Sequence, residues 1–540
     1  MLRAGFSSAP ASGVNLGLQD CKVLASIARM RGVFDWTLSL ARLAWSLIVL
    51  GLYCGPVVAR ELVIENVTAV SAERSEPMRN VTVAVRDGRI VSISHYSSAQ
   101  AATAAQDREV IDGRGLYLSP GLIDSHVHTD QVHGMTPQHE AAHPDIARAA
   151  RAQNPRSYLY FGFTTLIDLI SVPEAIERWN RQPEHPDIYF CGATPIVDGY
   201  PMVWAPKPER YQQFPYLIVQ RGEEATAPEG IDPVAHTPDA VIERMKRDGA
   251  SCVKTFYERG EAGKWPIPRL ETIRALVNAA HRAQLPVLIH ATSTEAQEFA
   301  LDAGVDIIAH GLWSWTGDPD TSKLTPRVIK VLNRIVKARV AWQPTMQVSY
   351  GFRDMFDPDS LADPQLTHVL PASSIAWYRT PEGQWFRDTI ARSLPKETLQ
   401  GDAPDQWQRV RAFYQQTIAR NANVTHYLAE HHARLLFGTD TPSSPLYTNP
   451  PGLNGWREMN RLVEAGLTPA QVFRAATLAN AQALGLESEI GTVQVGKRAN
   501  LLLLRNDPTR SIQAYDQIVK VILNGRVLER SALSATGGAG

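Results

Sequence analysis

The sequence predicts an α/β protein, a (β/α)8 TIM-like barrel with a small β-sandwich domain composed of both N- and C-terminal segments. Three observations lead to this prediction. The chain of 540 residues exceeds what one small core usually serves. Through its middle, eight short apolar runs alternate with helical stretches, which is typical of parallel strands joined by helices. At both ends, segments alternate apolar and polar residues as antiparallel strands do.

The first 59 residues predict export. Basic residues precede the apolar run LAWSLIVLGLY at 43–53, and small residues at Val57 and Ala59 suit a signal peptidase. Residues 1–59 are therefore interpreted as an N-terminal extension with a signal peptide, or with a signal anchor that stays uncleaved, although the run is short for a membrane span. We expect an exported protein, periplasmic or secreted, which the anchor alternative would hold at the membrane.

The β-sandwich domain is expected from residues 60–118 and 486–532. The segments ELVIENVTAV, VTVAVRDGRIVSIS and EVIDGRGLYLSP have the alternating pattern, and so do GTVQVGKRANLLLLRN and VKVILNGRVLE. Asp87-Gly88 and Asn524-Gly525 are turn signals between such strands. Because both ends share one pattern, we infer that they build one domain. Residues 533–540 are predicted to be a disordered tail.

The barrel is expected from residues 119–485. Eight strands are the number that a closed barrel requires. They are predicted at 122–128, 162–170, 187–196, 251–257, 286–291, 306–311, 339–347 and 434–440. Two connections, 197–250 and 348–433, are too long for plain crossovers. Long loops at the strand ends of a barrel form substrate pockets.

Composition excludes some classes of function. The 54 Lys plus Arg nearly balance the 55 Asp plus Glu, which gives a formal net charge of -1, and no long basic run is present. Nucleic-acid binding is therefore not expected. The four cysteines are too few and too scattered for a disulfide framework or a cysteine zinc site. Cys191 and Cys252, inside the predicted barrel, are expected to be buried free thiols.

Potential metal ligands stand at the ends of the predicted barrel strands. His126 and His128 end the first strand, and residues two apart on a strand point to the same side. Later strands end in similar residue types, and catalytic residues of barrels lie at these C-terminal strand ends. The further residues are Lys254, His290, His310 and Asp440, with Gln343 on the seventh strand.

Each residue type has a role in a metal centre. Imidazole suits zinc, and two metals about 3.5 to 4 Å apart need a bridging anion. Lys254 could provide one, because a buried lysine with a lowered pKa can add carbon dioxide and become a carbamate. The structural alternative is an ion pair between Lys254 and Asp440.

This pattern resembles the amidohydrolase superfamily from about residue 62 to 530. Within it, the spacing of IHATSTEAQEFALDAGVDIIAHG, with His290 and His310 twenty positions apart, is closest to imidazolonepropionase-like and Xaa-Pro dipeptidase-like members. Two positions depart from such dipeptidases: Thr292 stands where many carry histidine, and NGWREM lacks a histidine after strand eight. The other matching segments are GLIDSHVH, GFTTLID, Lys254, QPTM, GTD at 438–440, LVEAGLTPAQVFRAATLANAQALGL and IGTVQVGKRANLLLL.

The resemblance implies a binuclear metal centre. His126 and His128 would hold the first metal, His290 and His310 the second, and Lys254 as carbamate would bridge them. Asp440 would ligate the first metal and act as the catalytic base. The expected cofactor is Zn²⁺, two per chain, with another divalent metal as the alternative.

The resemblance also implies hydrolysis of an amide or related C–N bond by metal-activated water. A dipeptide, an N-acyl amino acid or a cyclic amide is the implied substrate. An ester or lactone hydrolase using the same metal centre and a non-catalytic binding relative are alternatives, and the complete ligand set favours an enzyme. Deamination is disfavoured, since deaminases of the superfamily lack the lysine of strand four and place a glutamate after the histidine of strand five.

Aromatic residues gather in the loops predicted around this centre. The segment after strand three contains Tyr200 and Trp204, HGLWSW places Trp313 soon after His310, and SYGFRDMF follows strand seven. They predict a small-molecule substrate with an apolar or aromatic portion. The alternative is that these rings pack among themselves. A homo-oligomer stays an open alternative.

Other polar residues near the predicted strand ends are assigned from their position alone. Tyr257, three residues after Lys254, is expected to hydrogen-bond the substrate carbonyl, or else to be a packed aromatic. His133, His139 and His143 are expected to be solvated loop histidines.

Overall fold

The computed structural model describes residues 61–98, 108–207, 209–260, 263–315, 317, 321–394, 399, 403–443 and 445–537. The predicted extension with its signal peptide or signal anchor, residues 1–59, lies outside the described residues. The chain from residue 60 onward forms one compact unit. In the described ranges, no helix is long and apolar enough to cross a membrane.

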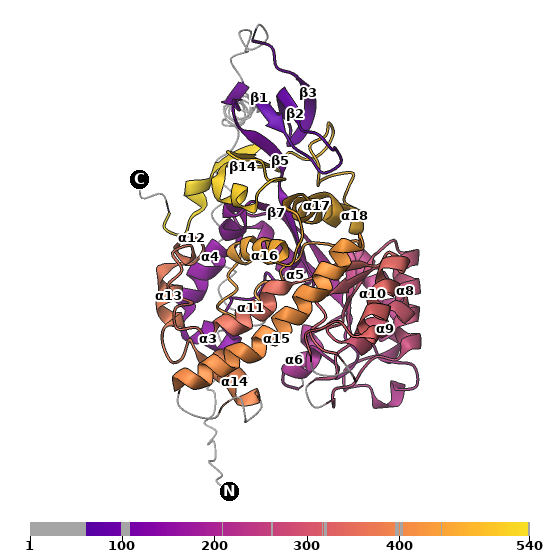
Figure 1. The fold of residues 1–540 in the computed structure, drawn as a ribbon. Helices are drawn as coiled ribbons and strands as arrows, with labels where there is room; N and C mark the ends of the chain where they lie inside the picture. Colours follow the sequence, from indigo (N-terminus) through magenta and orange to yellow (C-terminus); the bar gives the residue numbers. More distant parts are fainter. Residues whose placement is uncertain are drawn as a thin grey trace, which may run out of the picture. The chain divides into compact units, whose positions relative to one another are not determined.

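A curved parallel sheet of seven strands lies at the centre of the described chain, with its strands in chain order (Figure 1). Each run predicted between 122 and 347 contains one of these strands. Their residues are almost all buried, as expected when both faces of a parallel sheet are covered. The strands are β6 (Leu122–Val127), β7 (Phe163–Asp168), β8 (Asp187–Ala193), β9 (Cys252–Phe256), β10 (Val287–His290), β11 (Ile307–Ala309) and β12 (Ala341–Gln343).

The eighth predicted strand, residues 434–440, connects the two edges of this sheet without being a regular strand. Leu435 forms a parallel bridge with Trp342 of β12, and Thr441 forms one with Val127 of β6. Between these bridges the N–H groups of Phe437 and Thr439 donate to the side chains of Asn480 and Asp124, and Asp440 has a φ of 59°, in the left-handed region that a strand does not use. The curved sheet with this bridging segment fits a TIM-like barrel.

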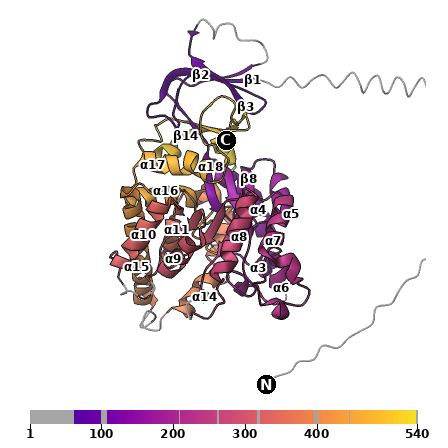
Figure 2. The same cartoon turned by 90° about the vertical axis from the view of Figure 1, so that its right-hand side faces the viewer.

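Helices cover the outer face of this sheet (Figures 1 and 2). Residues such as Val253 and Ile289 of the strands pack there against Ile273 and Leu332 of the helices. The helices of this layer are α4 (Pro144–Tyr160), α5 (Pro173–Asn180), α7 (Pro238–Arg247), α8 (Leu270–Arg282), α9 (Thr294–Ala303) and α10 (Pro326–Ala338). Short helices α3 (Pro137–Ala142) and α6 (Glu209–Gln213) lie in the loops after β6 and β8.

The boundaries of α9 follow from its sequence. The Ser293 hydroxyl accepts a hydrogen bond from the Ala296 N–H, which satisfies a backbone donor at the first turn. Gly304 ends the helix with a φ of 79°, a conformation that costs glycine little. This compact crossover places the end of β10 beside the end of β11.

The connection at 348–433 is mostly helical, so the expected long loop is wrong there. Its rings explain the difference: Phe352 stacks on Tyr414 at 5.6 Å, and Phe356 lies 5.2 Å from Trp407. Phe352 and Phe356 of SYGFRDMF therefore pack against rings from later in the same connection. The helices are α11 (Met346–Asp354), α12 (Leu366–Val369), α13 (Ala372–Tyr378), α14 (Trp385–Ser393) and α15 (Ala403–Glu430).

A second sheet joins the two ends of the described chain. Its eight strands have the order β15-β14-β13-β5-β1-β2-β3, with β4 beside β1, and β5 pairs antiparallel with β13. The two ends therefore meet as expected, whereas a separate β-sandwich domain is not confirmed. The strands are β1 (Glu61–Ala69), β2 (Met78–Arg86), β3 (Arg89–His95), β4 (Arg108–Asp112), β5 (Tyr117–Pro120), β13 (Leu501–Leu504), β14 (Ile518–Leu523) and β15 (Arg526–Glu529). Helices α16 (Leu453–Glu464), α17 (Pro469–Arg474) and α18 (Asn480–Ala483) precede β13.

The start of the predicted disordered tail is ordered. Leu533 ends a short 3-10 helix, Arg530–Leu533, and is fully buried. Its carbonyl accepts a hydrogen bond from the Gln153 side chain, and the N–H of Ala535 donates to the carbonyl of His368. The prediction of disorder is therefore wrong for residues 533–537, since tertiary contacts hold them.

Cys191 and Cys252 form a disulfide bond, so the prediction of two free thiols is wrong. The two residues are direct neighbours in the parallel register of β8 and β9. Their Cα atoms are 4.4 Å apart, within the range that a disulfide spans. The bond is buried inside the barrel, two residues before Lys254 on β9.

Candidate metal centre

The predicted ligands meet at the C-terminal ends of the barrel strands. His126 lies near the end of β6, Lys254 on β9 and His290 at the end of β10, while His310 directly follows β11. The ring of His310 lies 4.7 Å from that of His126 and 4.5 Å from that of His290. His126 and His310 are 184 positions apart in the sequence, yet their rings lie close together.

Asp440 closes this group from the bridging segment. Its Oδ1 lies 3.0 Å from Nε2 of His126 and 3.0 Å from Nε2 of His128. One ligand atom each from His126, His310 and Asp440 lie within 4.8 Å of one another. This set of nitrogen and carboxylate donors is one that a transition metal such as zinc accepts.

Gln343 orients one of these histidines. Its Oε1 lies 3.2 Å from Nδ1 of His126, and its amide nitrogen donates to the Ser125 hydroxyl. A histidine that donates from Nδ1 presents the lone pair of Nε2, which is the arrangement that metal-binding histidines use. The predicted position of Gln343 on strand seven thus gives it a supporting contact with His126.

Lys254 is buried, and its Nζ has no hydrogen-bond partner among the described residues. Its ammonium therefore has no hydrogen bond to Asp440, as the structural alternative would require. Burial lowers the pKa of Lys254 to about 7, against the opposing effect of the Asp440 carboxylate. A buried, unpartnered amine near His126, His290 and His310 is unfavourable for the protein alone and suits a site completed by metal.

Burial also sets the protonation of the other groups. It lowers the pKa of His126 to about 3 and holds the pKa of His290 and His310 below the usual range. Burial alone would raise the pKa of the Asp440 carboxyl, but its contacts with His126, His310 and His128 hold that pKa well below its usual range. Neutral imidazoles and an ionised carboxylate are the forms that bind a metal.

Two of these residues have a strained backbone. His310 has a φ of 75° and Asp440 a φ of 59°, and neither is glycine. Such conformations cost about 1 to 3 kcal/mol each and concentrate at functional sites. The Asp440 N–H donates to the carbonyl of His126, which anchors the strained residue to β6.

Glu258 is a member of the site that the sequence reasoning missed. Its Oε2 lies 3.3 Å from Nε2 of His290 and accepts a 2.8 Å hydrogen bond from Thr292. Burial raises its pKa, but the contacts with His290 and Thr292 outweigh this and lower it to about 2. Glu258 lies four residues after Lys254, on the same side of the chain, so the period-two rule could have found it.

Tyr257 points the other way, into the helix layer. Its hydroxyl donates to Glu295 at 2.7 Å, and its ring lies 4.6 Å from Phe299. The structure therefore does not bring it together with the predicted ligands, and we assign it the alternative role of a packed aromatic.

Asp124 is a second buried carboxyl that the sequence reasoning did not single out. It accepts hydrogen bonds from the Thr439 hydroxyl at 2.6 Å and from the backbone N–H of His126 at 3.2 Å. Burial raises the pKa of Asp124 to about 7, although the Thr439 hydrogen bond opposes this. It joins the end of β6 to the bridging segment and so holds His126 and Asp440 in place.

Two of the four predicted substrate residues, Tyr200 and Trp313, lie beside the metal ligands. A third, Trp204, lies at the surface. The ring of Tyr200 is 4.5 Å from that of His290, and the ring of Trp313 is 5.6 Å from that of His310. Trp204 is 72% exposed and lies 5.4 Å from Trp265, a ring that the sequence did not single out. Burial, then the carboxylates of Asp440 and Glu258, raises the pKa of Tyr200.

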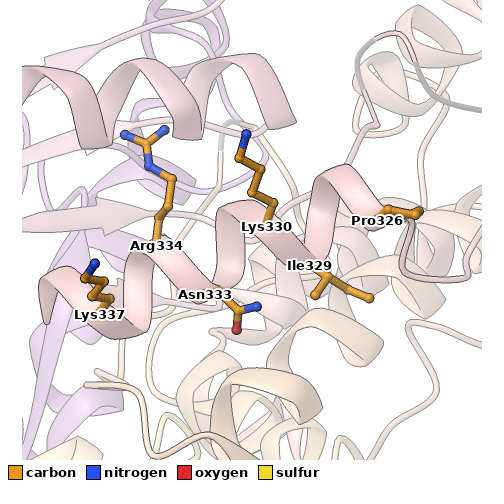
Figure 3. A pocket seen from close by; sticks show the side chains of 6 residues that line it. All are labelled: Pro326, Ile329, Lys330, Asn333, Arg334 and Lys337. Atoms are coloured by element: carbon orange, nitrogen blue, oxygen red, sulfur yellow. The ribbon is translucent and has the colours of Figure 1, made fainter.

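One small hollow lies at the border of the ligand cluster, and a second lies away from it. A cavity of about 10 Å³ adjoins His128, between Asn154, Tyr158 and Trp179. A shallow hollow of about 400 Å³ lies along α10, where the labelled side chains all come from one helix (Figure 3). It contains no potential metal ligand, so we do not assign it to the chemistry. Its lining residues are Pro326, Ile329, Lys330, Asn333, Arg334 and Lys337.

His133 is fully buried, so its expected place as a solvated loop histidine is wrong. Both ring nitrogens lack a hydrogen-bond partner in the described chain, and the ring lies 5.6 Å from that of Tyr378. The Tyr378 hydroxyl donates to the carbonyl of His133, which fixes the loop beneath α13. His139 packs beside Trp385, and His143 pairs with Glu382 at 2.9 Å.

His133 is expected to make the protein sensitive to mild acid. Burial lowers its pKa from the ordinary value of 6.5 to about 4. Between these values the unfolded chain binds a proton that the folded chain does not, so stability falls as the pH drops from 6.5 towards 4. At pH 5 this loss is roughly 2 kcal/mol. A His133→Met variant should lose less stability between pH 7 and pH 5 than the wild type does.

Urea unfolding of both proteins at the two pH values measures this difference. The control is His95→Gln, which removes a histidine from the exposed edge of β3. An equal pH dependence for His133→Met and wild type would contradict the assignment.

The chain matches the Amidohydrolase family over residues 117–324 and 412–528. A guanine deaminase of Mus musculus is 52% identical over 46 residues, which are 8% of this chain and 10% of the deaminase. The chain thus aligns with only about a tenth of that relative's length.

Solved structures resemble the chain over most of its length. A Xaa-Pro dipeptidase with bound methionine covers 87% of this chain and 100% of its own, with a TM-score of 0.57 and 19% identity. The ochratoxinase of A. niger covers 89% of this chain and 98% of its own, with a TM-score of 0.59 and 17% identity. At these identities the likeness shows the fold alone.

Proposed function

The chain belongs to the amidohydrolase family, whose members are metal-dependent hydrolases, and from this premise we propose that it hydrolyses an amide or related C–N bond of a small molecule. The observation that carries the proposal is the cluster of His126, His310 and Asp440 donor atoms beside the unpartnered Lys254 amine. Dipeptides, N-acyl amino acids and cyclic amides are the candidate substrate classes, each with an apolar or aromatic portion.

We expect the residues present to hold a metal pair. His126, His128 and Asp440 would hold the first metal, and His290 and His310 the second. The proposed metal is Zn²⁺, two per chain. When bound, such metals polarise a carbonyl and make water nucleophilic at neutral pH.

Lys254 is proposed to bridge the pair as a carbamate. The lone pair of its neutral amine attacks the carbon of carbon dioxide, a new N–C bond forms, and one proton leaves the nitrogen. The product is an anion with two oxygen donors. Burial, which lowers the pKa of Lys254 to about 7, makes the neutral amine available near neutral pH.

Asp440 is proposed to move the proton. Its carboxylate lies 3.0 Å from Nε2 of both first-strand histidines, so it borders the place where the water would be held. As a base it accepts the proton of that water, and as an acid it returns the proton to the leaving nitrogen. His126 and His128 orient Asp440, while Tyr200 at the ring of His290 helps to exclude water from the substrate side.

Removing the metal tests the proposal. We expect the purified protein to contain about two equivalents of zinc by elemental analysis. A chelator should abolish hydrolysis of amide probes, and added Zn²⁺ should restore it. Metal-free protein that binds small molecules without turnover would favour a binding protein instead. Turnover confined to esters or lactones would favour the alternative chemistry at the same centre.

Export is proposed for the same chain. Buried disulfides such as Cys191–Cys252 persist in oxidising compartments and are rare in the cytosol. Cell fractionation, with alkylation of the denatured and unreduced protein, checks the proposal. A cytosolic protein in which Cys191 and Cys252 react with the alkylating agent would contradict it.

A further inference from the structure

We propose that Tyr200, Trp265 and Trp204 form a subsite, bordered by Glu258, for an aromatic group that bears no carboxylate. The substrate would then be a neutral aromatic amide, not a dipeptide or an N-acyl amino acid with a free carboxylate at this place. The inference rests on the proposed function and narrows its substrate class.

The three rings form a continuous strip from the ligands to solvent. Tyr200 lies 4.5 Å from the ring of His290 and is stacked on Trp265 at 5.8 Å. Trp265 in turn lies 5.4 Å from Trp204, which is 72% exposed. Phe256 supports the inner end, 5.9 Å from Tyr200. A flat apolar group can stack against rings arranged in this way.

Packing fixes the strip to Glu258. The turn after Glu258 passes beneath Trp265, because a Cβ on Gly260 would meet the Trp265 ring at 2.6 Å. Glu258 is held at three points, by His290, by Thr292 and by the N–H of Gly260 at 3.1 Å. Its carboxylate therefore has a fixed position at the inner end of the strip, where Tyr200 lies in the field of both Glu258 and Asp440.

Three arginines and one lysine on the surrounding segments are engaged elsewhere. Arg259, the neighbour of Glu258, pairs with Glu295 at 2.7 Å on the helix side. In the loop after β8, both Arg210 and Lys207 pair with Asp198. Near Trp313, Arg420 donates to the carbonyls of Trp313 and Thr321 and lies over the ring of Trp315.

These contacts make the strip unsuited to a carboxylate. Proteins recognise carboxylates with paired donors, most often from arginine, and a like charge at close range disfavours binding. Here the fixed charge beside the strip is negative, and the arginine nearest in sequence is turned to the other face. Aromatic groups that are uncharged avoid this repulsion and keep the ring contacts.

A pair of chromogenic amides tests the inference on the zinc-loaded, full-length protein. The probes are 4-nitroacetanilide and its counterpart with a carboxylate on the ring next to the nitro group, which differ in that one substituent. We expect kcat/KM to be at least about 10-fold higher for the neutral probe. Equal values, or a preference for the carboxylated probe, would overturn the inference.

Variants separate the two parts of the subsite. Glu258→Gln should reduce the preference to about 3-fold or less, because the negative charge is removed. Trp204→Leu, at an exposed ring, should raise KM for both probes and leave their ratio unchanged. The matched control is Glu298→Gln, which removes a carboxylate that pairs with Arg327 on the helix side and should keep the wild-type ratio. An unchanged ratio in Glu258→Gln, with normal zinc content, would overturn the role of Glu258.

Binding measurements distinguish this inference from the proposed function. Dissociation constants of both probes are measured by quenching of tryptophan fluorescence in Asp440→Asn, in which turnover is expected to be blocked. Tighter binding of the neutral probe supports the subsite even if the wild type hydrolyses neither probe. The absence of hydrolysis would then count against the proposed amide hydrolysis and not against the subsite. Hydrolysis of both probes without a preference in binding would overturn the subsite alone.

Discussion

Lys254→Ala is expected to lose at least one equivalent of metal per chain and about 10³-fold or more of its amide-hydrolysing activity. The amine of Lys254 is buried without a hydrogen-bond partner in the described structure, among histidines whose rings lie 4.5 to 4.7 Å apart. Removing a bridging ligand removes several kcal/mol of charge stabilisation from a metal centre, and each 1.36 kcal/mol is tenfold in rate. Elemental analysis and kcat measured on the same preparations check this result.

Two further variants define the role of Lys254. Lys254→Arg keeps a positive charge but cannot form a carbamate, so it should fail as Lys254→Ala does. Lys497→Ala is the control: Lys497 is also mostly buried, its amine bonds to Thr492 near the second sheet, and burial lowers its pKa as well. It should keep the wild-type metal content. Normal metal content and activity in Lys254→Arg would show that Lys254 acts only as a structural cation.

Asp440→Asn is expected to lower kcat by about 10³-fold or more while some metal stays bound by His290, His310 and Lys254. The amide has the shape of the carboxylate but takes no proton from water. Because Asp440 Oδ1 lies 3.0 Å from His126 and His128, the first metal should bind more weakly as well. Steady-state kinetics together with zinc titration of the metal-free variant separate the two effects.

The control for Asp440 lies at the opposite end of a strand. Asp187 begins β8 and accepts hydrogen bonds from Asn500 and Asn524, which flank β13 and β14 of the second sheet. Asp187→Asn should destabilise the fold by about 1 to 3 kcal/mol and leave kcat unchanged, because the N-terminal strand ends of a barrel serve stability. If Asp440→Asn keeps kcat within tenfold of wild type, Asp440 is not the proton carrier.

The strands were predictable where burial dominates the local sequence. Seven of the predicted runs contain a strand because a parallel sheet buried on both faces requires a continuous apolar run. The eighth run, which ends at Asp440, has the same composition but only bridges its neighbours. In this run the N–H groups of Phe437 and Thr439 bond to side chains and Asp440 is left-handed, and hydrophobicity carries no information about either feature.

The part of the site that lies on the barrel strands was predictable from strand geometry. Lys254 and the histidines follow from the rule that alternate residues share a face. The same rule places Glu258, and not Tyr257, on the side of Lys254, so that choice was an error of interpretation. The disulfide could not be predicted by this rule. The pairing of Cys191 with Cys252 depends on the register between β8 and β9, and the spacing of the two cysteines along the chain does not determine that register.

The burial of His133 could not be read from the sequence for a similar reason. Its loop is polar and follows a strand end, where solvated residues are common. What covers it is Tyr378, from a helical segment far along the chain. Contacts between segments so distant in sequence are set by the assembled fold.

The pairing of β5 with β13 has a consequence for the life of the nascent chain. Pro120 and Leu501 are register partners, yet roughly 380 residues separate them. At a synthesis rate of about 5 to 20 residues per second, the edge of β5 stays unpaired for roughly 20 to 80 seconds before β13 is synthesised. Through that interval an unpaired strand edge is open to other chains, a known route to aggregation. Chains truncated before β13 would never cover it, so ribosome stalling or proteolytic loss of the last forty residues should yield insoluble protein in place of a smaller enzyme.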